Sequence, residues 1–366
     1  MKILLLLTEL FRIKGGIQNF NLSFLRAIND LAGQYLWNVK VFVLNDDPCD
    51  GMKLLKDFKN IDFQLFGRNK LKFFITAVFQ GLAVDKVIFG HINFAVIAMF
   101  MPNKVYKYLV VHGIEVYKKL SCWLLQMVLK MHKVLSVSQY TKHEMIRLNP
   151  SLASQNFIVF PNTLSGMLKP LNNFHMKTKN ELNLPDWKLI LTVSRLDSRE
   201  RYKNIDLILE AMQEVLSSVP DVCCVIVGDG SDKKRLEQKM LALGLEKNVF
   251  FVGNVSGEDL YSYYSLCDLF VLPSTGEGFG IVFLEAMYFS SPCIGARSRA
   301  VPEVIEDAST GILCNPDDVK DLVSAMIKLL QDSKLRFQYG TSGKKKFEQC
   351  FSFDAFRQRL EKVLCS

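Results

Sequence analysis

Residues 273–287 read Pro-Ser-Thr-Gly-Glu-Gly-Phe-Gly-Ile-Val-Phe-Leu-Glu-Ala-Met and follow directly on the apolar run Leu269–Leu272. The run predicts a buried β-strand and the segment from Gly280 onward predicts a helix, so the glycines lie in a strand-to-helix turn. Glycine lets the backbone approach a ligand closely, and a helix start offers free N–H groups that suit phosphate or sugar oxygens. The stretch therefore indicates a ligand-binding turn. The alternative is an ordinary glycine-rich turn with two solvated glutamates, Glu277 and Glu285.

The same alternation of strand and helix extends over the whole chain. In the first half we expect strands at Lys2–Leu7, Val39–Leu44, Ile61–Phe66, Lys86–Gly90, Val105–Val111, Val134–Val137 and Phe157–Phe160. Amphipathic segments such as Ile17–Ala32 and Ser121–Lys133 predict helices between them. After a polar connection, Thr163–Asn183, strands are expected at Leu189–Ser194, Cys223–Gly228, Asn248–Val252, Leu269–Leu272 and Cys293–Gly295.

This pattern predicts an α/β protein of two doubly wound, Rossmann-like domains. We assign residues 1–167 to the first domain and 168–349 to the second. Residues 350–366 are expected to form a C-terminal helix that packs back toward the first domain. In such sheets ligands bind beyond the carboxyl ends of the strands, so the pattern predicts a cleft between two facing domains.

The charge of the chain is unevenly distributed. Residues 1–170 hold 21 Lys and Arg against 10 Asp and Glu, whereas residues 171–366 hold 24 against 27. The basic first half suggests an anionic partner, such as a membrane lipid, a lipid diphosphate or a polyanion. Nucleic acid is not favoured, because the chain has no Arg-rich run, helix-turn-helix pattern or aromatic binding signature. The stretch Arg68–Lys72 with the following Phe73–Ile75 reads equally as a helix lying on a membrane surface or as a core helix with a charged start.

The N-terminal and cysteine patterns favour a cytoplasmic protein. The short apolar run after Met1-Lys2 meets Thr8-Glu9 without a cleavage site, so it predicts a first strand and not a secretory signal. The nine cysteines form no Cys-x-x-Cys pair and read as reduced thiols, several of them in the core. Nothing in the pattern supports a metal site.

Further candidate residues follow other predicted strands. Arg195 and Lys203 come after Leu189–Ser194 and could neutralise a diphosphate, or could belong to a solvated charged loop. Gly15-Gly16 precede the first helix in a possible phosphate-cradling turn, although the full dinucleotide fingerprint is missing. His112 ends an apolar strand before Gly113; a lone histidine in such a place is more often structural.

With these residues in place, the chain resembles the retaining glycosyltransferases of family 4, which have the GT-B fold. The resemblance runs nearly end to end and is strongest from Leu189 to Asp317. It implies that Glu277 contacts the donor sugar, that Glu285 binds the ribose, and that Arg195 and Lys203 clamp the diphosphate. It further implies donor contacts from Gly15 and Gly16, His112, the turn at Gly253 and Asn254, and the helix start at Phe279, Gly280, Ile281 and Val282. Two departures are Lys203-Asn204 in place of Lys-Gly, and Arg297-Ser298-Arg299-Ala300 in place of a glycine-containing loop.

The resemblance implies a metal-independent hexosyltransferase without a cofactor, acting on a UDP-sugar such as UDP-glucose. The implied acceptor is a glycan or a lipid-linked glycan, as in assembly of bacterial surface polysaccharide. The charge of the basic first half agrees with such an acceptor and suggests peripheral contact with the anionic inner face of the cytoplasmic membrane. Alternatives are a GDP-mannose-dependent mannosyltransferase, a GT-B epimerase or phosphorylase, and a catalytically silent subunit that binds sugar nucleotides.

Overall fold

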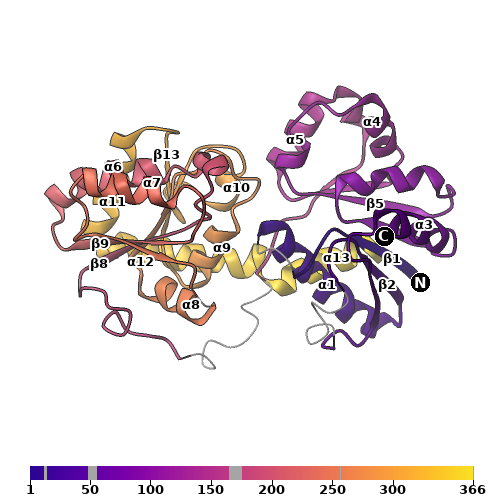
Figure 1. The fold of residues 1–366 in the computed structure, drawn as a ribbon, viewed down its shortest axis with the longest axis horizontal. Coiled ribbons are helices and arrows are strands. Elements are labelled where there is room, and N and C mark those ends of the chain that lie inside the picture. Colours follow the sequence, from indigo (N-terminus) through magenta and orange to yellow (C-terminus); the bar gives the residue numbers. More distant parts are fainter. Residues whose placement is uncertain (12–14, 48–55, 165–174, 256, 366) are drawn as a thin grey trace. The chain divides into compact units, whose positions relative to one another are not determined.

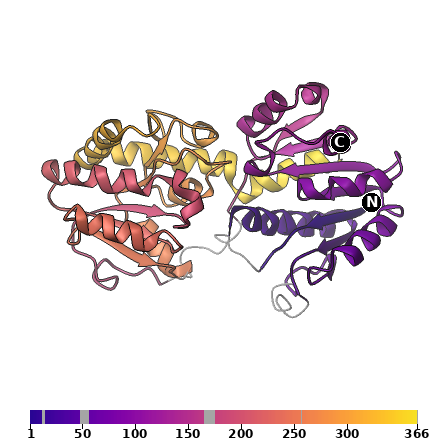
Figure 2. The same cartoon turned by 45° about the horizontal axis from the view of Figure 1, so that its top comes forward.

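The computed structural model describes residues 1–11, 15–47, 56–164, 175–255 and 257–365. The chain divides into two compact units, Met1–Leu168 with Phe351–Ser366, and Lys169–Cys350. Each unit is a parallel sheet with helices on both faces (Figures 1 and 2). Part of the predicted polar connection, residues 165–174, lies outside the described residues.

The first unit is built on a seven-stranded sheet in the order β3-β2-β1-β4-β5-β6-β7. The strands are β1 (Lys2–Leu7), β2 (Asn38–Val43), β3 (Ile61–Leu65), β4 (Lys86–Phe89), β5 (Tyr106–Val111), β6 (Lys133–Ser136) and β7 (Phe157–Val159). The helices are α1 (Gly16–Tyr35), α3 (Lys70–Gly81), α4 (Cys122–Leu129), α5 (Gln139–Leu148) and α13 (Phe353–Cys365). Short 3₁₀ segments are η1 (Ile92–Phe100), η2 (Ile114–Val116) and η3 (Pro150–Ser154).

Both faces of this sheet are covered, which explains why its strands are continuous apolar runs. On one face α1 packs against α13, and the rings of Phe20, Phe24, Phe160 and Phe356 interlock there. On the other face α3, η1 and α4 pack over a separate core cluster. The C-terminal helix α13 is therefore part of the first unit's core.

The second unit has a six-stranded sheet in the order β10-β9-β8-β11-β12-β13. The strands are β8 (Lys188–Val193), β9 (Val222–Val227), β10 (Val249–Gly253), β11 (Leu269–Leu272), β12 (Cys293–Ala296) and β13 (Gly311–Cys314). Helices α6 (Ile205–Ser218), α7 (Lys233–Ala242) and α11 (Val319–Gln331) cover one face (Figure 1). The other face is covered by α8 (Gly257–Leu266), α9 (Ile281–Tyr288) and α12 (Ser333–Lys346). The remaining segments are η6 (Ser198–Lys203), α10 (Val301–Val304) and the π-helical turn η7 (Phe347–Phe351).

The predicted fold class is confirmed, and each predicted strand is present with ends within one or two residues. Two details are corrected. The helix predicted over Ser121–Lys133 ends at Leu129, because the backbone at His132 already pairs with Lys107 of β5 and leads into β6. The sequence pattern does not predict strand β13, because four residues directly after a turn are too few to show a period.

The strand orders place one switch point in each sheet. In both sheets the first strand of the unit lies in the interior. The next two strands are added on one side of it and the later strands on the other side, so the order of strand addition reverses beside β1 and beside β8. Loops after the neighbouring strands diverge there and leave room for a ligand. In the second unit these loops follow β8 and β11.

Candidate functional site

The switch point of the second unit brings two predicted site residues into direct contact. Lys203 ends η6 after β8, and Glu277 lies in the glycine-rich turn after β11. Lys203 Nζ donates a hydrogen bond to Glu277 Oε1 at 2.5 Å, and the two side chains are only 18% and 11% exposed. Burial lowers the pKa of Lys203, but the charge and hydrogen bond of Glu277 outweigh it and the pKa lies above its usual value. A charged ammonium therefore lies beside a carboxylate at this end of the sheet.

The backbone around this pair is shaped by close packing between the two loops. The ring of Tyr202 lies against Gly276, where a Cβ would come within 2.1 Å of a ring carbon, so no larger residue fits. The Thr275 amide donates to the Tyr202 carbonyl at 2.8 Å. These contacts hold the glycine-rich turn against the loop that carries Lys203.

The conformation and contacts of Asn204 explain why it can replace the glycine of the Lys-Gly pattern. Its φ of 57° lies in the left-handed region, which Asn tolerates better than most residues with a side chain. Its side-chain amide donates to the Pro273 carbonyl at 3.0 Å and to Asp317 Oδ1 at 2.8 Å. The substitution thus adds a link from η6 to the turn after β11. Arg299 likewise adopts a positive φ, 48°, in the loop where the family has glycine.

Arg195 lies in the same pocket as Lys203. The pocket is also lined by Asp197, Glu200 and Asn204. Arg195 Nη2 donates to Glu200 Oε1, and the Arg195 side chain is 59% exposed. The Glu200 side chain is only 16% exposed, so the pair is open to solvent on the arginine side, where the guanidinium is accessible to an anionic ligand.

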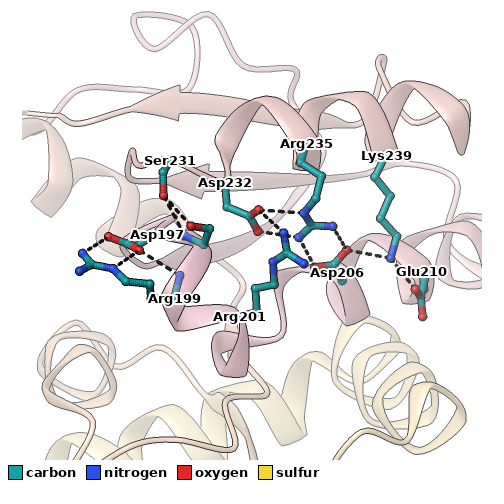
Figure 3. A network of polar contacts seen from close by, with 10 residues as sticks. Asp197, Arg199, Arg201, Asp206, Glu210, Ser231, Asp232, Arg235 and Lys239 are labelled. Atoms are coloured by element: carbon teal, nitrogen blue, oxygen red, sulfur yellow. Dashed lines mark hydrogen bonds and ion pairs between the residues drawn. The ribbon is translucent and has the colours of Figure 1, made fainter.

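A network of ion pairs fixes the segment that carries Arg195 and Lys203 (Figure 3). At its centre, Arg235 of α7 makes two hydrogen bonds to Asp206 of α6, at 2.7 and 2.6 Å, and two to Asp232, at 2.8 and 2.6 Å. Arg201 of η6 joins Asp232 at 3.2 Å. The hydrogen bonds from Arg235 hold the pKa of Asp206 down at about 2. The network ties η6, α6 and α7 together next to the Lys203 pocket.

Glu285 lies inside α9 and has a partner that no sequence pattern indicated. The hydroxyl of the buried Tyr264 donates to Glu285 Oε2 at 2.6 Å. Burial raises the pKa of Glu285 to about 7, although the bond from Tyr264 acts in the opposite direction. Tyr264 is itself held by stacking on Phe289, with ring centroids 5.8 Å apart. A paired tyrosine in α8 resembles any core residue in the sequence, so only the structure reveals this contact.

The remaining predicted residues of this unit lie at two strand-to-helix junctions. Gly280 has a φ of 91° and is the N-cap of α9, so Ile281 and Val282 form its first turn and Phe279 is buried just before it. Because glycine has no side chain, it cannot itself cap the amides of that turn. Gly253 ends β10 and Asn254 follows it; a Cβ on Gly253 would meet Nζ of Lys233 at 3.8 Å. Lys233 is therefore a further cation near this predicted binding turn.

In the first unit, the predicted residues follow β1 and β5. Gly15 is the N-cap of α1 and Gly16 its first residue. The Nε2 atom of His112 is 2.9 Å from the Gly90 carbonyl, which can only accept, so Nε2 carries a proton. The His112 ring also meets the edge of Phe20 in α1, with centroids 4.9 Å apart, and stacks near His91 at 6.4 Å. The structure thus links His112 to the helix that begins at Gly15-Gly16, and adds His91, which is the N-cap of η1 just after β4, to the group.

Within the described ranges, no three His, Cys, Asp or Glu side chains are grouped so that they could hold a metal ion. No helix in the described part of the chain has the length and apolar character needed to cross a membrane.

Part of the second unit matches a known protein family. Residues 176–346 match the family of glycosyl transferases group 1. The sulfoquinovosyl transferase SQD2 of Arabidopsis thaliana is 32% identical over 168 residues, which are 45% of this chain and 31% of that protein. A GDP-mannose-dependent phosphatidylinositol monomannoside mannosyltransferase of Mycolicibacterium smegmatis is 28% identical over 216 residues, 57% of this chain and 55% of that protein. The matches thus span about a third to about half of these relatives.

A solved structure matches over the full length. The crystal structure of HepE from Anabaena in complex with UDP has a TM-score of 0.80 and 21% identity, and the match covers 100% of both chains. Together with the two doubly wound sheets, this likeness confirms the GT-B fold. The residues that match the glycosyl transferases of group 1 include Lys203, Glu277 and Glu285.

Proposed function

We propose that the protein is a nucleotide-sugar-dependent glycosyltransferase that moves a hexose from UDP-glucose, or a similar UDP-sugar, to a glycan or lipid-linked acceptor. The observation that carries this proposal is the contact between Lys203 and Glu277 at the switch point. A diphosphate needs a cation and the hexose attached to it needs hydrogen-bond acceptors, and the pair offers both side by side. HepE has been crystallised with UDP and with UDP-glucose, which supports this class of donor.

Each predicted residue then has a defined task. Lys203 and Arg195 neutralise the diphosphate, together with the amides of Ile281 and Val282 at the start of α9. Glu277 accepts hydrogen bonds from hydroxyls of the hexose.

Glu285 accepts from the hydroxyls of the ribose, and the turn at Gly253 and Asn254 holds the base through main-chain bonds. From the first unit, the Gly16 amide contacts the diphosphate and His112 contacts the donor sugar.

Transfer proceeds with retention of configuration and without a metal ion. The bond between the anomeric carbon and the diphosphate oxygen breaks, and its electron pair leaves with the nucleotide. The acceptor hydroxyl oxygen bonds to the same face of the anomeric carbon, and its proton passes to an oxygen of the departing phosphate. Arg195, Lys203 and the α9 amides stabilise the negative charge that develops on this leaving group.

GDP-mannose is the second candidate donor. The relative from Mycolicibacterium smegmatis is named as GDP-mannose-dependent, and the residues that we assign to the base act through the main chain, which does not exclude guanine. The acceptor is a growing glycan of the bacterial surface, carried on a lipid at the cytoplasmic face of the membrane. The excess of Lys and Arg in residues 1–170, 21 against 10 acidic residues, supports a partner with negative charge.

The test is product analysis with UDP-glucose labelled in the glucose, with and without a lipid-linked glycan fraction. The proposal predicts release of UDP and movement of label into the acceptor with an α-linkage, unchanged by a chelator. Conversion of the donor to another UDP-sugar without acceptor would show an epimerase. Binding of the nucleotide sugar without turnover on any acceptor would show a silent binding subunit.

A further inference from the structure

The helix α3 carries an apolar stripe that no element among the described residues covers. Leu71 is 70% exposed, Ile75 45% and Phe79 70%, and four-residue spacing places them on one face of the helix. Leu82, just after the helix, is also exposed. The opposite face packs normally, since Phe73 and Ala77 belong to the core over the sheet. The exposed stripe is thus additional to the apolar residues that fold the unit.

The stripe continues onto the neighbouring segment η1. Phe100, which is 45% exposed, packs edge-on against Phe74 of α3 with ring centroids 5.4 Å apart. Met99 beside it is also exposed. We call these exposed residues the apolar patch: Leu71, Ile75, Phe79, Leu82, Met99 and Phe100. An exposed apolar patch of this kind marks a surface that contacts a membrane or another protein.

Basic residues border the apolar patch and acidic ones are missing from the segments that form it. Arg68, Lys70 and Lys72 are exposed at the start of α3, and Lys104 is exposed after η1. The sequence has no Asp or Glu in residues 63–84 or 86–114; Asp85 lies between them. Cations at a helix N-terminus oppose the helix dipole, so they do not serve to stabilise α3. Their position calls for an anionic partner outside the unit.

We propose that the apolar patch and its basic border form a docking surface for an anionic lipid bilayer. The side chains of Leu71, Ile75 and Phe79 enter the boundary between headgroups and acyl chains, while Arg68, Lys70 and Lys72 meet the lipid phosphates. A bilayer fits better than a protein partner because the charged residues of α3 itself, Lys70 and Lys72, are both basic, and the next acidic residue along the chain is Asp85, three residues after Leu82. This surface goes beyond the proposed function and does not depend on it, because lipid binding needs no donor or acceptor.

The test is co-sedimentation of the purified protein with vesicles, either of phosphatidylcholine alone or with added phosphatidylglycerol. We expect binding to the anionic vesicles that weakens with salt. Leu71→Gln with Phe79→Gln should lower partitioning at least tenfold, because two apolar side chains leave the interface. Lys70→Gln with Lys72→Gln should lower it about fivefold for each charge removed. These positions are exposed and Gln forms helices well, so the variants should keep the wild-type circular dichroism spectrum.

A matched control exists in the second unit. Phe337 on α12 is 77% exposed and has the exposed Lys334 three residues before it. The variant Phe337→Gln with Lys334→Gln should bind vesicles like the wild type. Equal loss in this control, no binding at low salt, or equal binding to neutral vesicles would overturn the proposal. So would a self-association in solution that Leu71→Gln with Phe79→Gln abolishes while vesicle binding is unchanged, since a second copy would then cover the patch.

Discussion

The contact between Lys203 and Glu277 makes the two side chains energetically dependent on each other. With Nζ and Oε1 2.5 Å apart and both side chains less than a fifth exposed, neither charge can be fully hydrated when its partner is removed. Removing one member of a buried ion pair destabilises a protein by about 3–5 kcal/mol. We therefore expect Lys203→Met to destabilise the second unit by about 3 kcal/mol, at the lower end because some solvent reaches the pair. That corresponds to a fall in melting temperature of about 6–12 °C for a unit of this size.

The double variant measures the interaction between Lys203 and Glu277 apart from their contacts with other residues. Glu277→Gln keeps the shape of the side chain and an oxygen that accepts from Lys203, but removes the negative charge. We expect the double variant Lys203→Met with Glu277→Gln to lose about 2 kcal/mol less unfolding free energy than the two single variants lose in sum. The assay is chemical unfolding of the four proteins, followed by a signal from the second unit. The control is the pair of Arg147 and Glu144 in the first unit, in which the arginine is 67% exposed and the glutamate 16%, and it should show a weaker coupling.

Additive single effects in this cycle would refute the reasoning, because the two charges would then not compensate each other. The same proteins also distinguish a loss of activity caused by unfolding from one caused by loss of a site residue. Since each single variant is expected to be less stable, activity has to be measured well below its melting temperature. The double variant should be the more stable protein and still lack transfer. Transfer by the double variant at a near-normal rate would remove both residues from the site.

Four further outcomes are expected. If the ionised Glu285 binds the ribose, donor affinity should fall as the pH drops through about 7, and Tyr264→Phe should move this midpoint upward, because the bond that favours the carboxylate is lost. Because its pKa is raised, protonated Glu285 stabilises the fold fully below its usual pKa of 4.5, and this contribution is lost as the pH rises through about 7. The wild type should therefore lose stability relative to Glu285→Gln over this pH range, as measured by chemical unfolding. Arg235→Met should destabilise the protein by about 2 kcal/mol, since charged hydrogen bonds to Asp206 are lost, and should raise KM for the donor more than it lowers kcat. Asn204→Ala should destabilise by about 2 kcal/mol, from a strained backbone and lost hydrogen bonds, and Asn204→Gly by less, because glycine accepts the positive φ.

The strands and the order of the elements could be predicted because each buried parallel strand is a short apolar run bounded by polar residues. This is why the predicted ends of Lys2–Leu7 and Leu269–Leu272 agree with the structure. The apolar residues Phe94–Phe100 form most of the 3₁₀ segment η1, and periodicity cannot distinguish such a segment from a strand or a helix. The end of α4 depends on pairing between β5 and β6, which is information from distant residues.

The site could be predicted as a set of strand-end residues but not as a set of contacts. Lys203 and Glu277 are 74 positions apart, and only the strand order of the sheet makes their loops neighbours. The bond from Tyr264 to Glu285 crosses from α8 to α9 in the same way. Sequence patterns show which residue types follow a strand, whereas pairing between side chains depends on how the loops pack.

The most direct measurement of the central claim is a thermal-shift titration with UDP-glucose, GDP-mannose and ADP-glucose on the wild type and on Lys203→Met. A ligand at one hundred times its Kd stabilises the folded protein by about 2.7 kcal/mol. We predict a rise in the wild-type melting temperature that saturates with UDP-glucose and is absent in Lys203→Met, with Arg147→Met behaving as the wild type. The claim is contradicted if none of the three nucleotide sugars changes the wild-type melting temperature, or if Lys203→Met responds to them equally.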